Sequence, residues 1–168
     1  IGEEDDHTQH GYLVFLAQQA PALADRIVAM GKFPQLLKTK TVNATVFNQL
    51  LFWRMRYAPN WSNRISDVEL EHAIQVMKAF ASESLPGLSE ADSRVLQETQ
   101  LGAAMAQQGL LHLQLFRDGG KKAGKRRREV MRGQLASIQN RHHALWLERN
   151  RPGGLKESLS HLAINRRY

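Results

Sequence analysis

Two long segments with helical apolar spacing, joined by Asp118-Gly119-Gly120, constrain the fold of this chain more than any other feature. In residues 90–117, apolar and small residues recur every three or four positions, as one face of a helix requires. In residues 125–149 the spacing alternates between four and three, as in a coiled-coil seam, through Met131, Leu135, Ile138, His142 and Leu145. The Gly-rich hinge between them predicts a long antiparallel helical hairpin, formed by about 90–117 and 125–149.

The middle of the first hairpin helix is crowded with small residues, namely Gly102, Ala103, Ala104, Ala106 and Gly109. A glycine in a helix interior costs about 1 kcal/mol relative to alanine. Close approach of a neighbouring helix, which small side chains allow, would compensate for this cost. We expect that neighbour to be the helix that follows, residues 125–149.

The other segments also carry helical signals. Ser66 and Glu69 form a capping box ahead of a helix that extends to about Ser84, and Ser89 precedes the hairpin. Pro21 either kinks a helix between Tyr12 and Met30 or lies in the first turn of a second one. No alternating strand pattern occurs. The sequence therefore predicts an all-α fold, a bundle of about six or seven helices forming a single helical domain over residues 1–168.

Length and composition exclude several classes of protein. A chain of 168 residues with 42% hydrophobic residues suits one domain with a sizeable core. No apolar run approaches the roughly 18–20 residues that cross a bilayer, so we expect no membrane partner. The absence of Cys removes disulfides and thiolate chemistry and favours a cytoplasmic location. No secretory leader is visible, although a chain that begins at Ile1 could have been cut.

The formal net charge of +7 is concentrated between Arg117 and Arg128, which suggests one alternative function. A basic helical module could bind nucleic acid or another polyanion through residues 121–128, with contacts from Lys121, Lys122, Lys125, Arg126, Arg127 and Arg128. Against this, the run has no interleaved aromatic residues and no motif of a known nucleic-acid module. It also lies at a helix start, where the dipole disfavours cations, so its side chains are expected to be solvated.

No motif for catalysis, metal binding or cofactor binding is present. The chain lacks the Gly-x-Ser-x-Gly, Walker, Gly-x-Gly-x-x-Gly and His-Glu-x-x-His patterns. His7 and His10 are spaced for a helical metal site but have no distant third ligand, so a solvated terminus is favoured. Glu69 is explained by capping. We therefore assign no catalytic residue, metal or cofactor, and expect the isolated chain not to be an enzyme.

A dense cluster of aromatic, cationic and turn residues ends the second hairpin helix. We interpret it as a structural corner formed by His142, Trp146, Arg149, Asn150, Arg151, Pro152, Gly153 and Gly154. His142 lies on the core seam and is expected to be a hydrogen-bonded core histidine. Trp146 is expected to be buried, so that its replacement by alanine would cost about 3–5 kcal/mol. The cations at the helix end are expected to bond the last carbonyls and anchor the turn.

This cluster also carries a family resemblance. Residues 145–155, with Ser158 and Leu162 following, resemble the extreme C-terminus of bacterial glycoside hydrolase family 20 proteins of the β-N-acetylhexosaminidase type. The specific motif is Trp-x-x-Arg-Asn-Arg-Pro-Gly-Gly. Residues 43–52 and 66–73 are similar to the start of the same region. The resemblance thus covers most of the chain from about residue 40.

The resemblance implies a non-catalytic helical region that follows a (β/α)8 catalytic barrel. The family's substrate-assisted catalysis uses an Asp-Glu pair on the barrel, and no matching pair stands in this sequence. The chain would then be a fragment lying C-terminal to the barrel of a glycoside hydrolase. Its expected partners are that barrel or a second copy of itself, and its role is to brace the barrel or to mediate oligomerisation.

Overall fold

The computed structural model describes residues 11, 13–39, 45–52, 60–119, 124–150 and 152–163. Within these ranges residues 13–19 are helical, and the elements that follow are α2 (Pro21–Gly31), η1 (Phe33–Leu36), α3 (Val46–Phe52), η2 (Ser62–Arg64), α4 (Asp67–Ser82), α5 (Glu90–Arg117), α6 (Lys125–Arg149) and α7 (Leu155–Leu162). The same ranges contain no β-strand. The predicted all-α bundle is confirmed.

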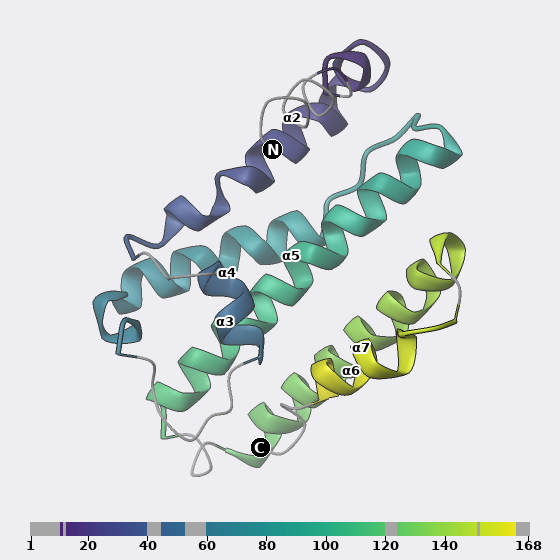
Figure 1. Cartoon of the computed structure of the whole chain (residues 1–168). Coiled ribbons are helices and arrows are strands. Elements are labelled where there is room, and N and C mark those ends of the chain that lie inside the picture. Colours follow the sequence, from purple (N-terminus) through teal and green to yellow (C-terminus); the bar gives the residue numbers. More distant parts are fainter. Residues whose placement is uncertain are drawn as a thin grey trace, which may run out of the picture.

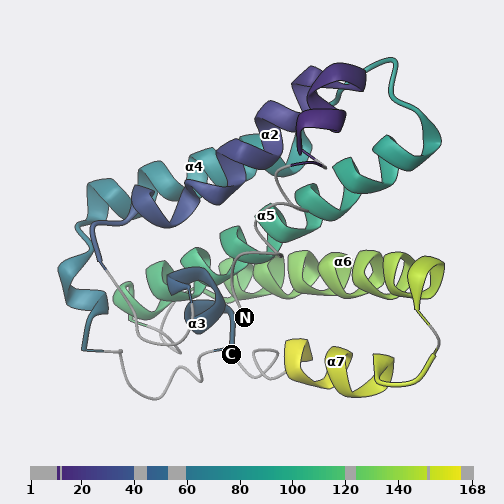
Figure 2. The ribbon, with the colours of Figure 1, turned by 45° about the horizontal axis from the view of Figure 1, so that its top comes forward.

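Helix α5 runs through the middle of the molecule and packs against four other helices (Figure 1). Helices α2 and α4 lie on one side of it, while α6 lies on the other with α7 alongside (Figure 2). Helix α3 packs on α5 and also contacts α7. The main core fills the space between α3, α4 and α5, around the fully buried Leu50, Met77 and Leu110.

Helices α5 and α6 form the predicted antiparallel hairpin. Two ion pairs join the first half of α5 to the end of α6. Arg94 Nε lies 3.1 Å from Glu148 Oε2, and Arg149 Nε lies 2.8 Å from Glu98 Oε1. The start of one helix therefore lies beside the end of the other, as an antiparallel pair requires.

The predicted helix starts are also confirmed. The Ser66 hydroxyl accepts the Glu69 N–H, and the Glu69 carboxylate accepts the Ser66 N–H, which completes the capping box. Ser89 caps α5 through the N–H of Asp92 at 3.1 Å. Pro21 is the first residue of α2, so it starts a second helix rather than kinking one. Helix α4 ends at Ser82, two residues before the expected end.

The small residues of α5 do accommodate a close neighbour, but the predicted neighbour is wrong. A Cβ atom on Gly109 would lie 2.9 Å from the Leu51 nitrogen and 3.0 Å from the Phe47 oxygen, both in α3. A Cβ on Gly102 would meet the Met30 side chain at the end of α2. The small residues do leave space on the surface of α5, but helices α3 and α2 pack into that space at Gly109 and Gly102, rather than α6.

Candidate functional site

The corner between α6 and α7 is built around a left-handed glycine. Gly154 precedes α7 with φ +80°, a conformation that glycine adopts without strain from a Cβ. This reversal places α7 against α6, with Leu155 and Leu162 buried. The His142 Nε2 atom lies 2.9 Å from the Ser158 hydroxyl, a hydrogen bond that joins the two helices. The corner therefore closes through both backbone geometry and a side-chain contact.

The two aromatic rings of the corner are less buried than the sequence predicted. His142 and Trp146 are both half-buried, and their rings meet edge to face at 5.6 Å. An added Cβ at Gly154 would lie 3.6 Å from Trp146 Cζ2, so the indole covers the turn. Neither residue is part of the central core between α3, α4 and α5. The hydrogen bond predicted for His142 is present.

The polar residues at the end of α6 are arranged differently from the prediction. The Arg149 guanidinium pairs with Glu98 on α5 rather than with the last carbonyls of its own helix, because the carboxylate offers a stronger, charged acceptor. The N–H of Asn150 donates to the Trp146 carbonyl at 2.8 Å. The Pro152 carbonyl accepts the N–H of Leu155 at 3.2 Å. Arg151 lies outside the described residues.

The basic run is only partly solvated. Lys121 and Lys122 lie outside the described residues, whereas Lys125 and Arg126 are exposed as expected. The expectation is wrong for Arg127, which pairs with Asp118 and donates to Gln114 Oε1 at 2.6 Å. Arg128 is half-buried. Two acceptors near the end of α5 thus engage one cation of the run and tie the start of α6 to α5.

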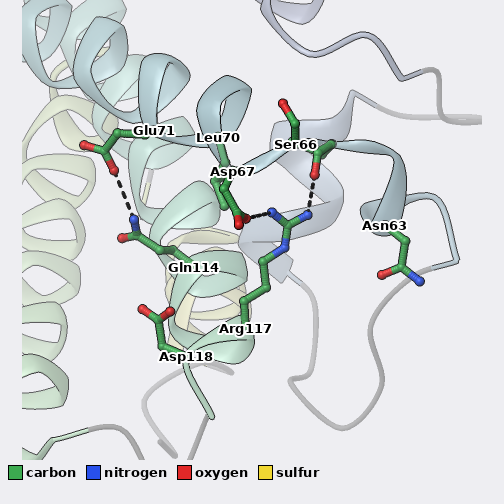
Figure 3. A pocket seen from close by; sticks show the side chains of 9 residues that line it. Asn63, Ser66, Asp67, Leu70, Glu71, Gln114, Arg117 and Asp118 are labelled. Atoms are coloured by element: carbon green, nitrogen blue, oxygen red, sulfur yellow. Dashed lines mark hydrogen bonds and ion pairs between the residues drawn. The ribbon is translucent and has the colours of Figure 1, made fainter.

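A polar cavity of about 750 Å³ lies where the end of α5 meets the start of α4 (Figure 3). Arg117 Nη1 bonds Asp67 Oδ1 at 2.6 Å, and Nη2 bonds the carbonyls of Ser62 and Ile65 at 2.8 and 2.6 Å. Gln114 Nε2 bonds Glu71 Oε2 at 3.1 Å. The guanidinium is surrounded by acceptors of its own chain, which gives it a structural role.

A second, largely apolar groove of about 710 Å³ lies between α5 and the α6–α7 corner. Its walls come from the end of α2, from η1, α3, α5, α6 and α7, and its lining includes Phe33, Phe47, Leu51, Met105 and Ala106. His142, Ser158 and His161 add polar atoms from α6 and α7. Burial lowers the pKa of His142. Apolar clefts of roughly 300–1,000 Å³ with a few polar groups are typical of ligand sites.

The Ser158–His142 contact resembles the first step of a nucleophile–base pair. Such a pair also needs a third group that orients the imidazole. Within the described residues no carboxylate pairs with His142. The arrangement therefore favours binding or packing over acyl-transfer chemistry.

Among the buried polar residues that the sequence analysis missed, two carry ionisable side chains. His112 is fully buried, with Nε2 3.1 Å from Gln108 Nε2 and Nδ1 3.5 Å from the Leu50 carbonyl. Burial lowers its pKa to about 4. Arg26 is also buried, pairs with Glu83 and lies 3.7 Å above the Phe80 ring. Only the position of His112 beside Leu113, on the buried side of α5, could have revealed it.

The remaining expectations concern metals, membranes and relatives. In the part of the chain that the structure describes, no cluster of three or more His, Cys, Asp or Glu is arranged to hold a metal, and His7 and His10 lie outside it. No helix in that part is long and apolar enough to span a bilayer. Comparison with protein-family models, curated proteins and solved structures found no match. The family-20 resemblance stays a prediction.

Proposed function

We propose that this chain is a non-catalytic helical accessory domain of a β-N-acetylhexosaminidase-like glycosidase, which braces the catalytic barrel or mediates oligomerisation. One observation supports this proposal more than any other. Three polar side chains of the segment that carries the resemblance, Glu148, Arg149 and Ser158, are engaged within the chain itself, with Arg94, Glu98 and His142 respectively. Because these side chains hold the helices of the chain together, the segment is better explained by a structural role than by a catalytic one.

The reading frame upstream of Ile1 provides the first test. We expect it to encode a (β/α)8 barrel with an adjacent Asp-Glu pair. An in-frame stop codon shortly before Ile1 would contradict the proposal. If the barrel is present, the barrel alone and the barrel joined to this chain should be compared by thermal unfolding. A raised midpoint in the longer protein, or its assembly into an oligomer, is the expected result.

The isolated chain should have no glycosidase activity of its own. Incubation with 4-nitrophenyl N-acetyl-β-D-glucosaminide is expected to release no more nitrophenol than buffer does. Hydrolysis at about 1 s⁻¹ or faster, which is within the ordinary range of enzymes, would refute the non-catalytic assignment.

The alternative, a polyanion-binding module, is favoured only by the exposure of Lys125 and Arg126 at the start of α6. Binding of labelled single-stranded DNA that weakens steeply with salt, and that is lost in the variant Lys125→Ala/Arg126→Ala, would support it. We expect no binding at low salt, because Asp118 already neutralises Arg127 and Glu129 lies 3.8 Å from Lys125.

A further inference from the structure

The groove beside the α6–α7 corner has an apolar part, formed by η1, α3 and α5, and a polar part, formed by α6 and α7. Phe33, Phe47, Leu51, Met105 and Ala106 supply apolar surface from η1, α3 and α5. On the α5 side the wall is formed by the small side chain of Ala106 and the longer one of Met105, while the Met30 side chain fills the space beside Gly102. A volume of about 710 Å³ suits a small organic molecule.

The polar groups contributed by α6 and α7 belong to one small cluster. Ser158 and His161 are three residues apart on α7, so both side chains lie on the same face of that helix. His142 on α6 reaches Ser158 at 2.9 Å. The cluster therefore presents two imidazoles and a hydroxyl to one region of the groove.

The ionisable residues of the lining restrict the charge of a ligand. Among the described residues that line the groove, from α2, η1, α3, α5, α6 and α7, there is no Asp, Glu, Lys or Arg, and the lining contains two histidines, His142 and His161. An imidazole is either neutral or positive. It can bond a neutral or an anionic group in either state, but it repels a cation once protonated. The groove thus favours a neutral or negative head group.

We propose that this groove binds a small amphiphilic carboxylate, such as a medium-chain fatty acid. Its chain lies against Phe47 and Met105. Its carboxylate accepts hydrogen bonds from His161 and from the Ser158 hydroxyl, whose oxygen accepts the Nε2–H of the His142 imidazolium. A carboxylate is preferred over a neutral head group because a hydrogen bond to a charged acceptor is roughly twice as strong as a neutral one. This inference does not depend on the role proposed for the whole chain.

The proposal predicts a specific dependence on pH. Burial lowers the pKa of His142, so the free protein carries a neutral imidazole there near pH 7. A bound carboxylate stabilises the imidazolium and raises that pKa. Ligand binding and proton binding therefore favour one another, and affinity should increase as the pH falls from 8 to 6.

Octanoate and octan-1-ol are suitable probes because they share an apolar chain and differ in the head group. Titrations of the isotope-labelled full chain can be followed by NMR, with the imidazole signals as the readout. At pH 6 we expect octanoate to bind at least about five times more tightly than octan-1-ol, as charge-assisted hydrogen bonds imply. We also expect the His142 pKa to rise in the octanoate complex. Equal affinities, or an unchanged His142 pKa, would overturn the proposal.

Variants separate the two parts of the groove. His142→Phe/His161→Phe should remove the preference for octanoate, whereas His72→Phe, at an exposed position on α4, should leave it intact. Met105→Trp fills the apolar part at a half-buried position and should weaken both probes at least tenfold. Circular dichroism shows whether each variant is folded. If Met105→Trp is unfolded, Ala106→Val is used in its place as a smaller change. Octanoate binding that survives in a folded filled variant would refute the site.

Discussion

At the scale of single residues, the most consequential feature is the buried imidazole of His112. It lies between helices, close to the Leu50 carbonyl and the Gln108 side chain, and Gln108 also donates to the Met131 carbonyl at 3.3 Å. Residues of α3, α5 and α6 thus share one polar contact within an apolar core. A neutral imidazole suits this environment, whereas a charged one would be poorly solvated.

This burial makes stability depend on pH. The pKa of His112 is about 4 in the folded chain, against about 6.5 for an unperturbed histidine, so the unfolded state binds more protons between these values. The free energy of unfolding should therefore fall as the pH decreases from about 6.5 to about 4, with a contribution of about 3 kcal/mol from this residue. Urea denaturation at pH 7.5 and 4.5 measures it. An equal pH dependence in His112→Leu and in the unmodified chain would contradict the assignment.

Two glycines provide a matched pair of substitutions with opposite expected signs. Gly109→Ala places a methyl group 2.9 Å from the backbone of α3, so we expect a loss of about 1–3 kcal/mol from overpacking. Gly133→Ala on α6 meets nothing within 4 Å and should gain up to about 1 kcal/mol from helix propensity. Chemical denaturation of both variants is the measurement. A neutral Gly109→Ala would show that α3 can move away at little cost.

Residue patterns predicted caps well and buried polar residues poorly. The Ser66–Glu69 and Ser89 caps depend on atoms three residues apart, so the sequence contains all the information they need. Arg26 and His112 are bonded to groups 57 and 62 residues away, at Glu83 and Leu50. Only the tertiary arrangement brings such groups together, so a local pattern cannot identify the partners of these two residues.

At the scale of elements, the approximate bounds of the hairpin helices and their antiparallel pairing were predicted, whereas the helices that pack on the small residues of α5 were not. Glu90–Arg117 and Lys125–Arg149 follow from Ser89, the glycines near residue 119 and the Pro-Gly-Gly stop. The sequence predicted one buried face on α5. In the second half of the helix the structure instead buries residues on several sides, namely Gln108, Gly109, Leu110, His112, Leu113 and Leu115. A helix surrounded by others has no solvent face to define a stripe.

The ion pairs that join α5 and α6 should contribute little individually. Arg149 and Glu98 have side chains that are 52% and 36% exposed, so water screens their attraction. A double-mutant cycle with Arg149→Met and Glu98→Gln is expected to give a coupling of about 0.2–1 kcal/mol. The coupling should shrink further in 1 M salt. A coupling above about 2 kcal/mol would indicate a more desolvated pair than the structure contains.

The half-burial of Trp146 lowers the expected effect of its removal. We now expect Trp146→Ala to cost about 1–3 kcal/mol, less than a fully buried indole would, because only part of its surface leaves water on folding. Denaturant unfolding measures the loss, with Leu147→Ala as an exposed control on the next position. A loss of the same size in both variants would mean that the indole does not hold the corner.

At the scale of the whole molecule, the fold class was the most predictable property and the function the least. Helical periodicity and the lack of alternating strands already define an all-α bundle. The groove could not be foreseen, because its walls come from six elements between Met30 and Leu162. The corner residues were predicted as a group because the turn and the helix end lie close together in the sequence.

The central position of α5 has a consequence for the order in which backbone amides exchange with solvent. Helices α2, α3, α4 and α6 all pack on it, so detaching any one of them leaves the middle of α5 covered by the others. Its amides near Leu110 should exchange deuterium only when the entire chain unfolds. Helix α7 packs mainly on α6 and α3. Its backbone amides should therefore exchange through local opening of that helix. The bundle would then lose protection from its C-terminal helix inward, ending at α5.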